Sequence, residues 1–313
     1  MARYLASRLA GMVIVMLLVA TLVFLITRHA PGDPAAVMLG EQATAADIAQ
    51  LRASYGLDKP LPVQFAYWLG ELARGNLGQS IFLQRPVTQA LAERAEPTFF
   101  LTMFAMAIAM LIGIPCGIAA AVWRNSWIDQ IFSGSAMLGA SIPSFWLGLI
   151  LMQMFAVSLG WFPVAGYGDP GVPLSNRLHH LVLPAIVLGI VNSALILRFS
   201  RASMLDVLGE DYIRTARAKG VSERRVVLHH ALRNALIPVV TVLGLTFALL
   251  IGGAIVTETV FGLPGIGNLV VSAVLRRDYP VIQGALLVIA GIYVLINFSI
   301  DLLYAVVDPR VKV

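Results

Sequence analysis

Two pairs of adjacent histidines, His179–His180 and His229–His230, offer side chains of a type that can bind a metal ion. Neighbouring side chains on a helix point in different directions, so an adjacent pair chelates poorly. The sequence also lacks an H-E-x-x-H motif and a Cys/His cluster. We therefore predict no metal site.

Nucleotide chemistry and covalent catalysis are equally poorly supported. No G-x-x-x-x-G-K-[ST] phosphate loop is present, so the sequence predicts no ATP site of its own. A serine nucleophile needs a base and a residue that orients this base, and no such set occurs at one depth of an apolar segment. We expect no catalytic residues and no cofactor bound by this chain.

A second group of polar residues lies inside long apolar stretches. Such residues usually face a helix bundle or a water-filled path instead of lipid. They could form the uncharged wall of a path for polar solutes, or they could form interhelical hydrogen bonds worth about 0.6 kcal/mol each. Both interpretations stay open for Gln153, Asn192, Ser193, Thr246, Gln283 and Asn297.

Asp301 is the one carboxylate that lies clearly within an apolar stretch. Arg198 is expected at a comparable depth, and an unpaired charge there would cost several kcal/mol. We predict that Asp301 forms a structural ion pair with Arg198 or, alternatively, with Arg201.

The composition decides the class of protein. Of the 313 residues, 58% are hydrophobic and 12% are charged, and the mean hydropathy is +0.83. Soluble domains carry about 25% charged residues, so these charges could not coat a soluble surface. The single cysteine, Cys116, cannot form an intrachain disulfide. The sequence predicts an all-α integral membrane protein.

Six apolar stretches are long enough to cross the bilayer as helices, which need about 20 residues. The first exceeds the 7–15 apolar residues of a signal peptide, so we expect it to be retained. Pro115 and Pro143 fall inside the second and third stretches and predict kinks or local breaks. The six predicted spans are 9–29, 98–122, 132–158, 181–200, 236–257 and 281–306.

The distribution of Lys and Arg predicts the orientation. With the N-terminus inside, the inner segments and Arg198 hold 13 of the 22 basic residues, as the positive-inside rule requires. Both termini are then cytoplasmic. We divide the chain into a first segment with its span (1–29), a helical extracytoplasmic insertion (30–97) and a core with five spans (98–313). Within the insertion, helices are expected at 45–55, 63–73 and 87–94.

The inner loop 201–235 is the most informative segment. Gly220 can adopt the left-handed conformation that ends a helix, and Ser222 can cap the next helix. Six basic residues surround this turn, at positions 214, 217, 219, 224, 225 and 233. The pattern predicts a charged helical hairpin, which could dock a soluble partner or lie on anionic lipids.

The segment YIRTARAKGVSERRVVLHHALRNALIPVVTVLG resembles the EAA-type loop of permease subunits in binding-protein-dependent ABC importers, in the oligopeptide/dipeptide/nickel branch. Arg214, Thr215 and Ala216 occupy the triplet positions, and Gly220 is the glycine of the pattern. Arg214, His230 and Arg233 depart from its Glu, Ile and Pro. The resemblance covers the whole chain and includes PGDP at 31–34, SIPSFW at 141–146, FGLPGIG at 261–267, RDYP at 277–280 and DPR at 308–310.

This resemblance implies a type I importer permease fold in the bacterial cytoplasmic (inner) membrane. It implies a second permease, two cytoplasmic ATPases that bind ATP and Mg, and an extracytoplasmic solute-binding protein. The solute would be a di- or oligopeptide, with nickel or glutathione as alternatives. The residues implied in coupling to the ATPases are Tyr212, Arg214, Thr215, Ala216, Arg217, Lys219 and Gly220.

Several alternatives stay open. Glu258, at the outer end of the fifth span, could meet the loop that contains Gly262, Gly265 and Gly267, or it could meet the binding protein. An ion-driven secondary transporter would need an ionisable residue near mid-depth and internal symmetry, which we do not find. An intramembrane enzyme would need a catalytic pair.

Overall fold

The computed structural model describes residues 2–29, 44–54, 58–169 and 171–307, and these residues are almost entirely helical. The PGDP motif at 31–34, Gly56 and the DPR motif at 308–310 lie outside the described residues. Two compact units are present. One contains residues up to Ala95 together with Leu269–Leu295, and the other contains Glu96–Asn268 together with the segment from Ile296 onward.

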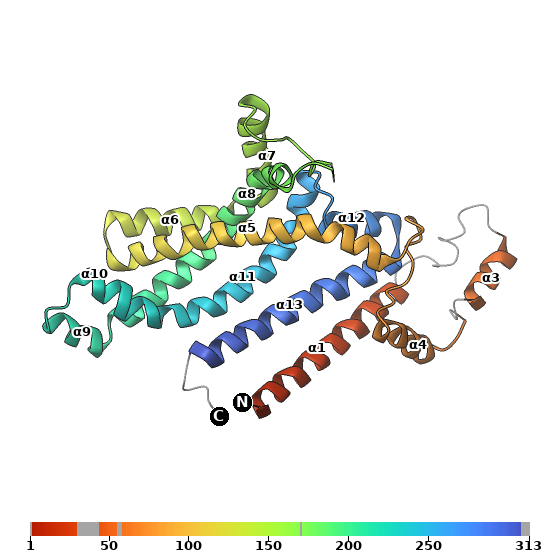
Figure 1. Cartoon of the computed structure of the whole chain (residues 1–313), viewed down its shortest axis with the longest axis horizontal. Coiled ribbons are helices and arrows are strands. Elements are labelled where there is room, and N and C mark those ends of the chain that lie inside the picture. The colour runs from red at the N-terminus through yellow and green to blue at the C-terminus, as the bar shows by residue number, and fades with distance from the viewer. Residues whose placement is uncertain (1, 30–43, 55–57, 170, 308–313) are drawn as a thin grey trace. The chain divides into compact units, whose positions relative to one another are not determined.

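Five of the six predicted spans are single helices long and apolar enough to cross a membrane. Each helix is longer than the span predicted for it, because polar residues next to the apolar stretch are helical too. Figure 1 shows these long rods, which are α1 (Ala2–His29), α5 (Val87–Val122), α8 (Leu174–Leu208), α11 (Leu232–Val260) and α13 (Tyr279–Val307).

The third predicted span is broken. Helix α6 (Trp127–Ser141) is followed by α7 (Ser144–Leu151), which continues as the π-helix η1 (Met152–Ser158), and the two parts are bent by 99°. Pro143 causes this break, since proline disfavours helical geometry at the preceding residue, and Ile142 is extended (φ −83°, ψ 123°). The expectation at Pro143 is confirmed, whereas α5 continues as a helix through Pro115.

The helices expected between the first two spans are α3 (Ala45–Ser54) and α4 (Leu61–Ala73). The third expected piece, 87–94, is not a separate helix. It forms the first turns of α5, because the polar sequence before Pro97 continues into the apolar span without a terminating residue.

In the first unit, α4 is packed on α1 through aromatic rings. Phe24 of α1 is 2% exposed, and its ring centroid lies 5.2 Å from that of Phe65 and 5.5 Å from that of Trp68. The buried Asp278 carboxylate accepts hydrogen bonds from the Ser80 hydroxyl (2.5 Å) and from the Ile81 and Phe82 backbone N–H groups. This carboxylate joins the loop before α5 to the turn between α12 (Ile266–Arg276) and α13.

In the second unit, α5 and α8 approach each other through glycines. A Cβ at Gly113 would lie 2.7 Å from Ile196 Cβ, and one at Gly117 would lie 2.6 Å from the Leu197 carbonyl oxygen. Gly189 of α8 faces Ile108 of α5 in the same way, at 2.7 Å. Along these contacts the residue numbers rise together in α5 and in α8, so the two helices run parallel. Their backbones lie close together, as small residues allow in membranes.

The loop after α11 closes around a buried carboxylate. Glu258 is 0% exposed, and it accepts hydrogen bonds from the Thr98 hydroxyl (2.6 Å) and the Asn268 N–H (3.0 Å). Gly262 has φ +59°, and the Leu263 N–H bonds to the Glu258 carbonyl (2.8 Å), which together end α11 in a tight turn. Of the two alternatives for Glu258, the glycine-rich loop is therefore confirmed.

The same end of the second unit is tied by Glu96. Its carboxylate accepts a hydrogen bond from the Tyr167 hydroxyl (2.8 Å) and pairs with Arg177 (2.5 Å). The Gly166 N–H also donates to the Phe261 carbonyl (2.9 Å). The loop between η1 and α8 is thus attached both to α5 and to the turn after α11.

We expect Gly117→Ala to destabilise the protein by about 1–3 kcal/mol, because the added methyl group meets backbone atoms of α8 that cannot move aside. Gly134→Ala in α6 is the matched control, since a Cβ there meets nothing within 4 Å. Thermal unfolding of both variants in detergent measures the difference. Equal midpoints would contradict the close contact of α5 and α8.

A second prediction concerns the buried carboxylate. A Cβ at Gly265 would lie 2.2 Å from the Glu258 carboxylate carbon, so Gly265→Ala must displace Glu258 and should lower the unfolding free energy by about 1–3 kcal/mol. Gly252→Ala has open space around its Cβ and serves as the control. Limited proteolysis of the loop after α11 should be faster only in Gly265→Ala.

Candidate functional site: a charged helical hairpin

The chain between α8 and α11 forms the predicted helical hairpin. Helix α9 (Asp211–Ala218) is followed by a turn, by the single turn α10 (Glu223–Arg225) and by the π-helix η2 (Val226–Ala231), which leads into α11. Figure 1 shows α9 and α10 beyond the ends of α8 and α11. One feature was not predicted: α8 stops at Leu208, and Gly209 and Glu210 separate it from α9.

Gly220 makes the turn of the hairpin. Its φ of +75° lies in the left-handed region that favours glycine. The Gly220 N–H donates to the Arg217 carbonyl (2.9 Å), and the Val221 N–H donates to the Ala216 carbonyl (3.2 Å). These two bonds form a Schellman motif, which confirms the predicted role of Gly220. Ser222 occupies the N-cap position of α10, but its side chain makes no capping hydrogen bond.

The inner face of the hairpin is apolar and holds it on the bundle. Ile213 is 0% exposed and packs with Val226, Val227 and Ala231 of the returning arm. The same cluster includes Met204 of α8, Ala121 at the end of α5 and Ala235 of α11. The hairpin is therefore packed at the point where these three helices end or begin, and it forms one body with them.

The outer face is polar and charged. Arg214, Thr215, Arg217 and Lys219 are exposed, and Tyr212 is 42% exposed. The Tyr212 hydroxyl accepts a hydrogen bond from Asn234 (2.8 Å), so α9 is joined to the first turn of α11. The half-buried Ala216 packs on the apolar cluster. Of the residues implied in coupling, all except Ala216 and Gly220 thus present polar side chains outward, while Ala216 faces the bundle.

The two arms of the hairpin are joined by an ion pair. Arg217 binds both carboxylate oxygens of Glu223, at 2.6 and 3.1 Å. The hydrogen bonds from Arg217 lower the pKa of Glu223, and Glu223 raises the pKa of Arg217. Because a depressed carboxyl pKa stabilises the folded state above the ordinary pKa, this contribution is lost as the pH falls through the acidic range. Both side chains are more than one third exposed, so the contribution is small.

Sequence reasoning missed the ion pair at the base of the hairpin. Arg201 of α8 binds Asp129 of α6, with Nε–Oδ1 2.7 Å and Nη2–Oδ2 2.8 Å. The partner of Arg201 is therefore Asp129, and the predicted alternative, a pair of Arg201 with Asp301, is wrong. The Arg198 side chain is exposed, and no ion pair of Arg198 is found among the described residues. Asp129 lies between the predicted spans 98–122 and 132–158, where nothing in the sequence indicates a buried partner.

None of the polar residues considered for a path lines the pocket described below. Asn192 and Ser193 donate to carbonyls of their own helix, those of Leu188 and Ile190. Gln283 donates to Thr27 (2.5 Å), an interhelical bond within the first unit. Gln153 is exposed on η1, Thr246 is fully buried in α11, and Asn297 is half-buried. A role of any of them in a path stays a prediction.

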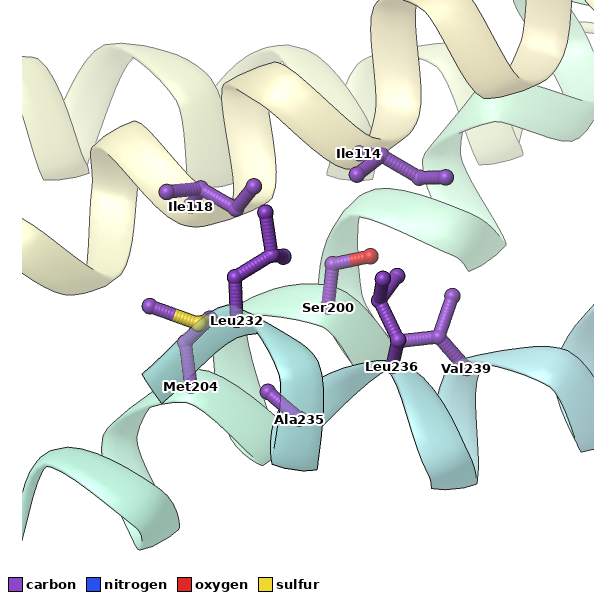
Figure 2. A pocket seen from close by; sticks show the side chains of 8 residues that line it. All are labelled: Ile114, Ile118, Ser200, Met204, Leu232, Ala235, Leu236 and Val239. Atoms are coloured by element: carbon purple, nitrogen blue, oxygen red, sulfur yellow. The ribbon is translucent and has the colours of Figure 1, made fainter. Parts of the chain in front are cut away.

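A narrow apolar pocket lies between α5, α8 and α11, next to the hairpin. Figure 2 shows Ile114 and Ile118 on one side and Leu232, Leu236 and Val239 on another, with the Ser200 side chain standing among them. Ser200 is 2% exposed, and within the described part of the chain its hydroxyl has no hydrogen-bond partner. The three helices thus meet here without a polar contact at Ser200.

The sequence matches two family models that together cover all of it except residues 103–112. Residues 113–313 match the binding-protein-dependent transport system inner membrane component, and residues 1–102 match the N-terminal model of the same type of membrane component. The resemblance inferred from the hairpin motif is confirmed.

Relatives match over the full length. The chain is 49% identical over 312 residues to the glutathione transport system permease protein GsiC of Pectobacterium atrosepticum, covering 100% of this chain and 99% of that protein. It is 45% identical over 310 residues to the probable peptide ABC transporter permease protein y4tP of Sinorhizobium fredii, covering 99% of each.

A solved structure shares the fold. A chain of the inward-facing MetNI methionine ABC transporter aligns with a TM-score of 0.59 at 21% identity, covering 70% of this chain and 97% of that chain. Together with the helical spans, these matches show that the chain is a multi-pass inner-membrane protein and belongs to the family of binding-protein-dependent transport system inner membrane components.

Proposed function

We propose that this chain is the membrane-spanning permease subunit of an ATP-driven importer that takes up glutathione or another short peptide. The observation that carries the proposal is the full-length identity of 49% and 45% to permeases named for glutathione and for peptides. Glutathione is itself a tripeptide, so both names describe solutes with the same amide and carboxylate groups. The chain itself would carry out no bond chemistry.

The hairpin would be the part that couples ATP hydrolysis to transport. Its Schellman turn at Gly220 and its apolar inner face make it a compact body, while its outer face offers charged side chains to a soluble protein. Two cytoplasmic ATPase subunits, which bind ATP and Mg, would contact this outer face. A second permease and an extracytoplasmic solute-binding protein would complete the importer.

The orientation follows from the distribution of basic residues. The hairpin and both termini would be cytoplasmic, which puts the loop before α8 and the insertion 30–97 outside. The rival class of ion-driven secondary transporters is disfavoured, because the relatives are named as permeases of a glutathione transport system and of a peptide ABC transporter. The intramembrane enzyme is disfavoured for the same reason.

The solute is tested by reconstituting this chain with its partner permease, ATPases and binding protein in liposomes. We expect uptake of labelled glutathione or of a labelled dipeptide, with ATP hydrolysis stimulated by the loaded binding protein. Calorimetry of the binding protein with both compounds decides between them. Uptake of nickel ions without a peptide would contradict the proposed solute class.

Replacement of Gly220 by valine tests the hairpin. A β-branched residue at φ +75° costs about 1–2 kcal/mol, so the turn must change its conformation. We expect Gly220→Val to lower uptake and solute-stimulated ATP hydrolysis about tenfold while the chain stays inserted. Gly75→Val is the matched control, because Gly75 also follows a helix at positive φ (+77°) with open space around it. Normal uptake by a well-expressed Gly220→Val protein would overturn the coupling role.

The orientation has its own test. In a Cys116→Ala background, Thr215→Cys should react with a membrane-impermeant maleimide only in inverted vesicles, because the hairpin faces the cytoplasm. Asp169→Cys, on the loop before α8, should react in intact spheroplasts. The opposite pattern would reverse the proposed topology.

A further inference from the structure

The Asp129 carboxylate is the most completely bound acidic group near the hairpin. Its side chain is 7% exposed and is held by Arg201 in a bidentate pair. It also accepts a hydrogen bond from the Asn125 N–H (3.0 Å) and one from the Ser133 hydroxyl (3.1 Å). Four donors from three segments therefore converge on one carboxylate.

These donors join elements that are distant in the sequence. Asn125 lies in the turn between α5 and α6, where it has φ +63°, and Ser133 lies one turn further along α6. Arg201 lies on α8, about one turn before Met204, which packs in the apolar cluster of the hairpin. Ala121 and Val122, the neighbours of the α5–α6 turn, belong to or pack against the same cluster. The ion pair thus lies beside the base of the hairpin.

An ion pair and an apolar contact respond differently to movement. Elsewhere α6 touches α8 through Ala136, Ala194 and Leu197, and contacts between apolar side chains have no preferred bonding direction. A bidentate arginine–carboxylate pair fixes both distance and direction, and separating it leaves a buried charge without compensation. The Asp129–Arg201 pair therefore resists sliding of α6 along α8, which the apolar contacts alone would allow.

We propose that Asp129 and Arg201 are positioning residues that make α6 and the α5–α6 turn move with the hairpin during transport. This inference rests on the proposed coupling role of the hairpin. It extends the moving body beyond the hairpin and the ends of α5, α8 and α11 to a further helix, α6. The bend between α6 and α7 at Pro143 then marks where this body ends.

A double-mutant cycle tests the pair in the reconstituted importer, with uptake of solute per ATP hydrolysed as the readout. We expect Asp129→Asn and Arg201→Gln each to lower this ratio about tenfold, with assembly and basal ATP hydrolysis retained. The double variant should be no worse than either single variant, because the two residues act as one unit. Asp129→Glu should recover part of the ratio, and Asp169→Asn, an exposed carboxylate, is the matched control.

A merely structural role would give a different result. The variants would then yield less assembled complex while the ratio of solute to ATP stayed at the wild-type value, which would overturn the proposal. A failure of the coupling role itself is recognised separately, because Gly220→Val would then transport normally.

A second measurement does not depend on the stability of these variants. Spin labels at Arg124→Cys in the α5–α6 turn and at Glu210→Cys at the start of the hairpin, in a Cys116→Ala background, report the distance between the two segments. We expect this distance to stay constant between the nucleotide-free and ATP-bound importer. A change of several ångströms would show that the segments move independently and would overturn the proposal.

Discussion

Backbone hydrogen bonding within each helix is the constraint on which this structure depends. Lipid offers no partner for a free N–H or carbonyl group, so a chain of this composition must satisfy these groups internally. Departures from α-helical bonding are consequently few in the described residues. Pro143 breaks one helix, η1 and η2 are π-helical, and glycines at 220 and 262 close helix ends.

Two of these departures, the turns at Gly220 and Gly262, give the two ends of the second unit different surfaces. At one end, Gly220 turns a charged hairpin whose inner face is packed on α5, α8 and α11. At the other end, Gly262 turns the chain so that Gly265 and Gly267 can lie against the Glu258 carboxylate. The first end presents charged side chains outward, whereas the second end is tied to neighbouring loops by two carboxylates, the buried Glu258 and the partly exposed Glu96. The exposed hairpin and the tied loop after α11 are thus built from the same kind of turn.

The sequence was sufficient for features that depend on neighbouring residues. The spans, the break at Pro143, the hairpin with Gly220 and the turn after α11 could all be predicted, because hydropathy, proline and glycine act locally. The family could be inferred from the motif around Gly220. The continuity of α5 from Val87 could not be predicted, because the polar sequence of its first turns resembles that of a separate surface helix.

Features that depend on distant residues were beyond the sequence. Asp301 was predicted to pair with an arginine because it lies in an apolar stretch. Arg201 instead pairs with Asp129, which lies next to a turn and has no sequence feature that indicates burial. Which arginine meets which carboxylate depends on the packing of α6 against α8, and a single sequence carries no record of that packing. Glu258 had two possible partners for the same reason, and the solute-facing residues remain a prediction.

The parallel course of α5 and α8 has a consequence for counting the crossings of the bilayer. Two adjacent parallel helices enter from the same leaflet, so the polypeptide that links them must return through the lipid an odd number of times. Within the described part of this link, the apolar segment long enough for the return is the pair formed by α6 and α7 with η1. Despite its 99° bend, this segment therefore crosses the membrane completely and is not a re-entrant loop. This crossing determines on which side of the membrane each later loop lies.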